Sequence, residues 1–236
     1  MKQTVLITGA ALRLGAAIAR TLARAGWSVV IHARRAAAQA EALRAELAPA
    51  SVWTVTGDLL PPGGPDAVFD AALACAGRLD ALVNNAAVFS RQPLASATAD
   101  DFERHWRLNA LAPILLTQRL ARHLAERDAP GAVVNLLDQR IVRPAADAVP
   151  YLLSKKALEA YTFSAALGFA PRVRVNAVAP GAVLPPSDAA ASEPAGAFPL
   201  GAPPLADAVA DAVRLLLDTP ALTGQVLFID GGQHLL

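Results

Sequence analysis

Short, continuously apolar runs alternate with segments of helical periodicity along almost the whole chain. Apolar runs without polar alternation are typical of parallel strands covered on both faces, and the segments between them are long enough for crossover helices. Right-handed crossovers then predict an α/β fold, a doubly wound seven-stranded parallel sheet with helices on both faces. The predicted strands are Val5–Ile7, Trp27–Ile31, Val52–Val55, Leu79–Val83, Ala132–Leu137, Val173–Val178 and Val226–Ile229.

The predicted helices fill the intervals between these strands, with apolar residues three and four positions apart. The 236 residues suit one α/β domain spanning 1–236, because such folds often exceed 200 residues as a single unit. The irregular, Pro-rich stretch 182–204 is expected to be a substrate loop, with a disordered surface insertion as the alternative. The helices are Leu12–Ala25, Ala-rich and Pro-started segments ending at Leu47 and Ala76, Ala99–Glu126, Tyr151–Phe169 and Leu205–Leu217.

Charge and composition argue against several classes of partner. The 21 basic and 20 acidic residues give a net charge of +1, so we expect no nucleic-acid partner and no membrane-surface patch. A single Cys75 excludes a disulfide framework, and scattered histidines without paired spacing predict no metal site. No run of 18 apolar residues predicts a membrane span, no signal peptide is recognised, and a cytoplasmic location is expected. On the long helix, His105 and His123 are expected at the surface.

The turn after the first strand has the character of a dinucleotide-binding turn. It runs from Thr8-Gly9 to Leu14-Gly15, and its glycines would let a pyrophosphate approach the backbone at a helix N-terminus. Arg13 replaces the middle glycine of the usual pattern. We expect Gly9, Arg13, Leu14 and Gly15 to bind a cofactor, although such turns also occur simply for tight packing.

The end of the second strand indicates which dinucleotide is used. An Asp or Glu there binds the ribose 2′-hydroxyl of NAD, but this chain reads His32-Ala33-Arg34-Arg35. Two guanidinium groups suit a 2′-phosphate through bidentate hydrogen bonds, so His32, Arg34 and Arg35 predict NADPH. The alternative is that both arginines are solvated residues at a helix start.

A Tyr–Lys pair supplies candidate chemistry. Tyr151 and Lys155 are four residues apart and therefore share one helix face. A nearby ammonium is expected to lower the pKa of Tyr151, which could then act as a general acid for a group that receives hydride. The alternative is an ordinary polar pair on a helix surface.

Taken together, these motifs resemble the short-chain dehydrogenase/reductase family, whose fold is Rossmann-type, over essentially the whole chain. The resemblance implies that Asp58 contacts adenine, that Asn85 and Ala86 border the adenosine side, and that Asn109 holds a water relaying protons to Lys155. It further implies that Lys155 bonds the nicotinamide ribose and that the loop after Pro180-Gly181 meets the nicotinamide amide. The motifs that carry it are Thr8-Gly9 to Gly15, Asp58, Asn84-Asn85-Ala86, Asn109, Tyr151/Lys155, Pro180-Gly181 and Asp230-Gly231-Gly232.

One departure from the family narrows the substrate class. The family usually places a Ser about thirteen residues before the Tyr, where this chain has Asp138, and no Ser or Thr occurs from Gly131 through Tyr151. A carboxylate is a poor partner for a carbonyl oxygen but accepts hydrogen bonds from ring N–H and amino groups. With Arg13 near a substrate carbonyl and Phe89 stacked on a flat ring, the set resembles the pteridine reductase branch.

That resemblance implies NADPH-dependent reduction of a dihydropterin or dihydrofolate, with Tyr151 and Lys155 protonating a ring nitrogen. Each residue has another interpretation: Arg13 binds only phosphate, Phe89 only packs, or Asp138 is only a turn residue. The alternatives are a carbonyl reductase or alcohol dehydrogenase of another substrate, and a catalytically silent NADP-sensing regulator. The family also implies a homotetramer built on helices 99–126 and 151–169 and the last strand.

Overall fold

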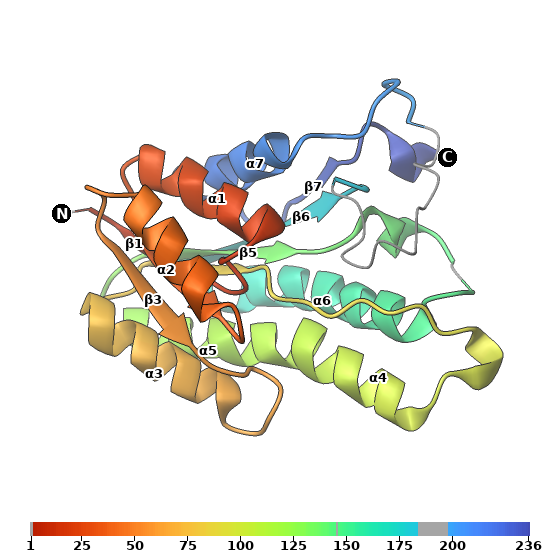
Figure 1. Cartoon of the computed structure of the whole chain (residues 1–236), viewed down its shortest axis with the longest axis horizontal. Coiled ribbons are helices and arrows are strands. Elements are labelled where there is room, and N and C mark those ends of the chain that lie inside the picture. The colour runs from red at the N-terminus through yellow and green to blue at the C-terminus, as the bar shows by residue number, and fades with distance from the viewer. Residues whose placement is uncertain (1, 145, 184–197) are drawn as a thin grey trace.

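The computed structural model describes residues 2–144, 146–183 and 198–236, and seven strands of this part of the chain form one sheet (Figure 1). All neighbouring strands are parallel and follow the order β3-β2-β1-β4-β5-β6-β7. The predicted doubly wound sheet is therefore confirmed. The strands are β1 Thr4–Ile7, β2 Ser28–Ala33, β3 Val52–Thr56, β4 Ala81–Asn84, β5 Gly131–Leu136, β6 Val173–Pro180 and β7 Val226–Ile229.

Helices cover both faces of the sheet. Figure 1 shows α1 and α7 on one side and α3, α5 and α6 on the other. The boundaries agree with the sequence expectation to within a few residues, and the predicted helix at 99–126 is divided by a π-helical turn, Arg107–Leu111. The helices are α1 Arg13–Arg24, α2 Ala37–Glu46, α3 Gly64–Ala76, α4 Ala99–Trp106, α5 Ala112–Glu126, α6 Val149–Gly168 and α7 Ala206–Asp218.

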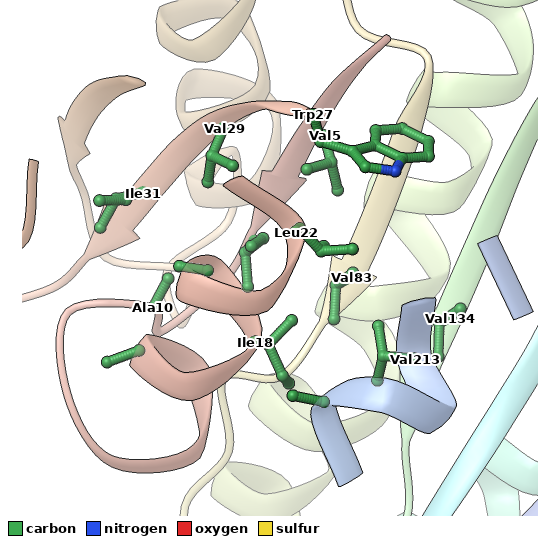
Figure 2. Packing of buried hydrophobic residues seen from close by; sticks show 14 of the residues in the cluster. Val5, Ala10, Ile18, Leu22, Trp27, Val29, Ile31, Val83, Val134 and Val213 are labelled. Atoms are coloured by element: carbon green, nitrogen blue, oxygen red, sulfur yellow. The ribbon is translucent and has the colours of Figure 1, made fainter. Parts of the chain in front are cut away.

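Alternate residues of each strand supply two separate cores. Val5 and Ile7 of β1 face the layer of α1, α2 and α7, whereas Leu6 between them faces the layer of α3, α5 and α6. Figure 2 shows Ile18 and Leu22 of α1 packed against the strand valines. Both side chains are completely buried, and each such burial stabilises the fold by roughly 1.5–3 kcal/mol. The apolar strand runs are therefore explained by burial on two sides.

The order of the strands reverses between β1 and β4. Val5 lies opposite Val29 of β2 on one side and Ala81 of β4 on the other. Chain connections leave such a switch point in opposite directions, which opens a crevice at the carboxyl ends of the strands. Gly9, Asn85 and Ala86, which are among the functional residues predicted from the sequence, follow the ends of these two strands.

The long helical path from α4 to α5 is interrupted where Asn109 lies. Thr98 and Asp101 form a capping box that starts α4. Pro113 in the first turn of α5 has no N–H to donate to the carbonyl four residues earlier, that of Asn109, and the path departs from α-geometry in this turn. Single π-turns of this kind are frequent at functional sites.

Two further findings bear on the class of protein. Within the described part of the chain, no helix has the length and apolar character needed to cross a bilayer. The described residues also contain no group of three or more His, Cys, Asp or Glu that could hold a metal ion.

Candidate active site

A groove of about 390 Å³ lies over the carboxyl ends of β1 to β4. Its volume falls in the usual range for small-molecule sites. Three arginines line the groove, namely Arg13, Arg34 and Arg104, whereas Asp58 is the one carboxylate among its lining residues. The groove therefore suits an anionic ligand. The lining residues are Gly9, Leu12, Arg13, Leu14, Gly15, His32, Arg34, Asp58, Leu59, Leu60, Asn85, Ala86, Ala87, Val88, Arg104 and Leu108.

The turn after β1 is held tightly against the turn after β4. Thr8 Oγ1 accepts hydrogen bonds from the backbone N–H groups of Asn85 and Ala86, both at 3.0 Å. The Asn85 side-chain amide donates in return to the carbonyls of Thr8 and Gly9, at 2.8 and 3.0 Å. A Cβ on Gly15 would lie 2.4 Å from the carbonyl oxygen of Gly9. This close approach explains why the sequence needs glycine here.

Arg13 adopts the left-handed backbone conformation that a glycine would take more readily. Its φ is +55°, and it stands where the usual pattern has the middle glycine. A non-glycine residue in this region is strained by about 1–2 kcal/mol. The neighbouring Leu14 lines the groove and packs against the core of α1, α2 and α7. Its side chain also lines the groove, and backbone strain of this kind is frequent at functional sites.

The residues at the end of β2 differ in their exposure. His32 is buried, its Nδ1 accepts from the N–H of Gly9 at 3.2 Å, and its Nε2 lies 3.0 Å from the carbonyl of Gly57. Burial lowers the pKa of His32, so the ring is neutral and joins the ends of β1 and β3. Arg34 is exposed at the groove, 3.9 Å from Asp58. Among the described lining residues Arg34 is present and Arg35, although exposed beside it, is not.

Tyr151 and Asp138 meet at the carboxyl edge of β5. Asp138 lies two residues beyond the end of β5, and its Oδ2 accepts a hydrogen bond from the Tyr151 hydroxyl at 2.9 Å. Burial tends to raise the pKa of Asp138, but hydrogen bonds and charge from Arg140 outweigh it and hold that pKa below its ordinary value. The structure thus places a carboxylate, not a hydroxyl, beside the candidate proton donor.

The expected lowering of the Tyr151 pKa is wrong. Burial raises the pKa of Tyr151 well above its ordinary value, and the charge of Asp138 raises it further. Lys155 Nζ lies 5.9 Å from the Tyr151 ring centroid and donates to the carbonyl of Leu136 at 2.6 Å. Burial lowers the pKa of Lys155 to about 8, so its ammonium is destabilised but still predominates at pH 7. Tyr151 therefore holds its proton firmly in this structure.

Phe89 packs against the ring of Tyr151 and is not among the residues that line the groove. The two ring centroids are 4.9 Å apart in an edge-to-face arrangement, and 45% of Phe89 is exposed. His105 contacts Tyr151 from another side, at 6.2 Å between centroids. The expectation that His105 lies at the surface is wrong: it is completely buried, and its ring nitrogens meet Ser90 Oγ and the carbonyl of Asp101.

Asn109 connects the loop after β4 to the Tyr–Lys helix. Its amide accepts from the N–H of Val88 at 2.8 Å and donates to the carbonyl of the same residue at 2.9 Å. The amide nitrogen also lies 3.1 Å from Ser154 Oγ on α6. Because Ser154 directly precedes Lys155, Asn109 fixes the helix that carries the Tyr–Lys pair. The water relay implied by the family remains a prediction.

The strand-end residues Pro180 and Gly181 lie at the carboxyl end of β6. The N–H of Gly181 bonds the carbonyl of Ile229, and a Cβ on Gly181 would lie 2.9 Å from Asp230. Gly181 is therefore packed against the end of β7 and the residue that follows it. Residues 184–197 of the expected substrate loop 182–204 lie outside the described residues, so the role of that loop remains a prediction.

Two arginines of the site were not identified from the sequence. Arg104 of α4 lines the groove, and exposed arginines on helices give no motif that would have identified it. Arg140 pairs with Asp138 through Nε and Nη2, at 3.1 and 3.0 Å. The sequence did offer a signal for Arg140. An Asp at a strand end commonly accepts a hydrogen bond from the backbone N–H two residues further on, and that residue is Arg140.

The geometry defines a nucleotide-type groove beside a Tyr–Lys–Asn set, and residues 3–195 match the family described as short chain dehydrogenase. The chain therefore belongs to the short-chain dehydrogenase family and is an oxidoreductase of that type. The predicted family membership is confirmed.

Several relatives with assigned activities are similar over nearly the whole chain. One is a putative ketoacyl reductase of a granaticin polyketide synthase from Streptomyces violaceoruber, 35% identical, covering 98% of this chain and 96% of the relative. Another is pteridine reductase 1 of Leishmania tarentolae, 32% identical, with 98% and 96% coverage. A crystal structure of the FolM alternative dihydrofolate reductase 1 from Brucella canis, complexed with NADP, superimposes with a TM-score of 0.90 at 34% identity, with 99% and 95% coverage. The predicted resemblance to the pteridine reductase branch is confirmed.

Proposed function

We propose that the protein reduces a dihydropterin or dihydrofolate with NADPH. The observation that carries this proposal is the carboxylate of Asp138 beside the Tyr151 hydroxyl, at 2.9 Å. A carboxylate accepts from the amino and ring N–H groups of a pterin, whereas it repels the oxygen of a simple carbonyl. The named activities of the Leishmania and Brucella relatives support this substrate class.

The groove fits an NADP-type dinucleotide. Gly9 and Gly15 carry no side chains, so a pyrophosphate could approach the backbone at the start of α1. Arg34 at the end of β2 offers a guanidinium to a 2′-phosphate, and no acidic residue replaces it at that strand end. Arg13 would add a second positive charge near the pyrophosphate. NADP in the Brucella structure supports the same assignment.

The residues of the chain hold the proton and orient the ring. When bound, reduced nicotinamide supplies hydride to a ring carbon. Tyr151 keeps a proton on its hydroxyl because its pKa is raised, and that hydroxyl is the donor to the adjacent ring nitrogen. Asp138 accepts from the pterin amino edge, and half-exposed Phe89 offers an apolar face to the flat ring.

A carbonyl reductase is the second candidate, because a relative named as a putative ketoacyl reductase is 35% identical. The position of Asp138 disfavours it, since a carbonyl oxygen developing negative charge would lie near a carboxylate. The third hypothesis, a silent NADP sensor, is disfavoured by Asn109, Tyr151 and Lys155, which a sensor does not need.

The test follows NADPH absorbance with a panel of dihydropterins and dihydrofolate. We expect turnover by the wild type, a loss of about 10²–10⁴-fold in Tyr151→Phe, and a reduced rate in Asp138→Ser. Tyr161→Phe is the matched control, because Tyr161 lies on the same helix but contacts Ile114 instead of the site. Tight NADPH binding without any pterin turnover would contradict the proposed substrate class and favour a carbonyl reductase.

We also propose a homotetramer built on the long helices. Leu153, Phe163 and Leu167 leave an exposed apolar face on α6, and Leu167 is 84% exposed. Exposed apolar faces of this kind commonly mark subunit contacts. Sedimentation velocity of Leu167→Glu, beside the wild type, tests this: a tetramer that is unchanged by the substitution excludes the α6 face from the interface.

A further inference from the structure

Arg140 occupies the hydrogen-bonding capacity of Asp138 that is not used by Tyr151. Asp138 Oδ1 accepts from the backbone N–H and from Nε of Arg140, at 2.8 and 3.1 Å. Oδ2 accepts from Nη2 of Arg140 and from the Tyr151 hydroxyl, at 3.0 and 2.9 Å. A carboxylate offers about four acceptor positions, and all four are filled. No further N–H donor can reach Asp138 in this arrangement.

The same guanidinium also lies over the rings of Phe89 and Tyr151. Its Cζ is 5.0 Å from the centroid of Phe89 and 5.5 Å from that of Tyr151. A flat, delocalised cation stacks well on such rings. Arg140 therefore combines the two features expected of the substrate, a pair of parallel N–H donors on Asp138 and a planar group against Phe89.

We propose that Arg140 is an internal mimic of the substrate, and that it is displaced when a ring with an amidine edge binds. The inference rests on the proposed function, because a dihydropterin carries such an edge in its 2-amino-pyrimidinone ring. Arg140 and that ring present the same pair of N–H donors at the same spacing. They compete for one carboxylate.

Displacement of the side chain leaves Asp138 in position. The backbone N–H of Arg140 still holds Oδ1, and the Tyr151 hydroxyl holds Oδ2 until it turns to the ring nitrogen, so the loss of Nε and Nη2 releases one acceptor position on each oxygen. A forked donor needs this arrangement. The side chain of Arg140 is 26% exposed, and its route to water is therefore short.

The exchange also explains selection between substrate classes. A ring with two N–H donors replaces both bonds that Arg140 gives up. A simple ketone has no donor to offer, so its binding would leave the Asp138 carboxylate buried with fewer partners. Rings with an amidine edge can therefore displace Arg140 from Asp138, whereas simple carbonyl compounds cannot.

The test compares Arg140→Ala and Arg140→Lys with the wild type, using calorimetry of 2,4-diaminopteridine binding to the NADP⁺ complex; when protonated at N1, this ring presents paired N–H donors to a carboxylate. We expect Arg140→Ala to bind about tenfold more tightly, which is about 1.4 kcal/mol, and to lower KM for a dihydropterin in parallel. Arg140→Lys, which lacks the planar fork, should lie between the two. Arg44→Ala is the matched control, because Arg44 also pairs with a carboxylate through Nε, at 2.7 Å, but lies on α2.

Free guanidinium ion separates competition from a structural role. At concentrations that do not unfold the protein, guanidinium chloride should weaken diaminopteridine binding to Arg140→Ala towards the wild-type value. Equal ionic strength from sodium chloride should not do so, and wild type and Arg44→Ala should show no such response. A purely structural role for Arg140 predicts no selective effect of guanidinium.

The possible outcomes separate the two levels of argument. Weaker, unchanged or absent diaminopteridine binding by Arg140→Ala, with NADP⁺ affinity intact, overturns the mimic. Absence of dihydropterin turnover by the wild type overturns the proposed function instead. In that case the calorimetric comparison still decides whether Arg140 competes for Asp138.

Discussion

Replacing Lys155 by Met should stabilise the cofactor-free protein at neutral pH while removing its activity. Lys155 is 3% exposed, and burial lowers its pKa from 10.5 to about 8, with the charge of Asp138 acting in the opposite direction. Between pH 8 and 10.5 the unfolded chain holds a proton that the folded protein has released. The free energy of unfolding therefore rises with pH across this window, and the full penalty is present below pH 8.

The size of the effect follows from that difference in pKa. The interval from about 8 to 10.5 corresponds to about 3 kcal/mol, at roughly 1.36 kcal/mol per pH unit. Methionine has similar volume, but it leaves the Leu136 carbonyl without its 2.6 Å bond, which costs about 1 kcal/mol. The expected net gain at pH 7 is about 2 kcal/mol. Above pH 10.5 only the lost bond remains, so the variant should be less stable by about 1 kcal/mol.

Urea titrations of the two proteins at pH 7, 9 and 10.5 measure this difference. Lys2→Met is the control, because Lys2 is exposed at the start of the chain and should show no such pH dependence. A Lys155→Met protein that is less stable than the wild type at pH 7 would refute the reasoning. So would a stability difference that stays constant as the pH rises from 8 to 10.5.

Three further substitutions test the groove and the fold. Arg34→Ala should raise KM for NADPH by about 10–100-fold and leave KM for NADH nearly unchanged, because only NADPH has the 2′-phosphate; steady-state kinetics with both cofactors measure this. Gly15→Ala should weaken NADPH binding at least tenfold by calorimetry, since its Cβ would lie 2.4 Å from the Gly9 carbonyl oxygen. Asp80→Ala should lower the free energy of unfolding by about 3 kcal/mol in urea, because this buried carboxylate holds the N–H of Thr4 and the guanidinium of Arg127. The contrary results are an equal rise in KM for NADPH and NADH in Arg34→Ala, an unchanged NADPH affinity in Gly15→Ala, and an unchanged urea midpoint in Asp80→Ala.

The fold could be predicted because each strand is buried on both sides. Val5, Leu6 and Ile7 face alternate cores, so no polar alternation interrupts the run and the parallel arrangement follows. The doubly wound arrangement followed from the handedness of the crossovers, whereas the order of the strands was established only by the structure. The π-turn at 107–111 could not be read from the periodicity, because Pro113 alone signals a disturbance and Pro is also common in a first helical turn.

The candidate site was only partly predictable. Motifs identified the Gly9–Gly15 turn and the Tyr–Lys helix because close backbone approach and i,i+4 spacing are local properties. The pKa of Tyr151 is not local: the sequence brings Lys155 within one turn, but burial and Asp138, thirteen residues away, determine the direction. The expected surface position of His105 failed for the same reason, since only the packing of α4 against α6 shows that it contacts Tyr151.

The exchange of Ser for Asp at position 138 accounts for much of the difference between this site and the usual family arrangement. The carboxylate raises the pKa of Tyr151, and it recruits Arg140, whose charge acts on both groups in the opposite direction. When a substrate displaces that guanidinium, ring N–H donors replace the two bonds that Arg140 gives up, and the positive charge of Arg140 moves away from both groups. Binding and protonation are thereby coupled: the event that frees the Asp138 oxygens for the ring also removes a cation that lowers the pKa of Tyr151, so the hydroxyl remains protonated until the ring nitrogen takes the proton. A serine at position 138 would provide neither the recruitment of Arg140 nor this coupling.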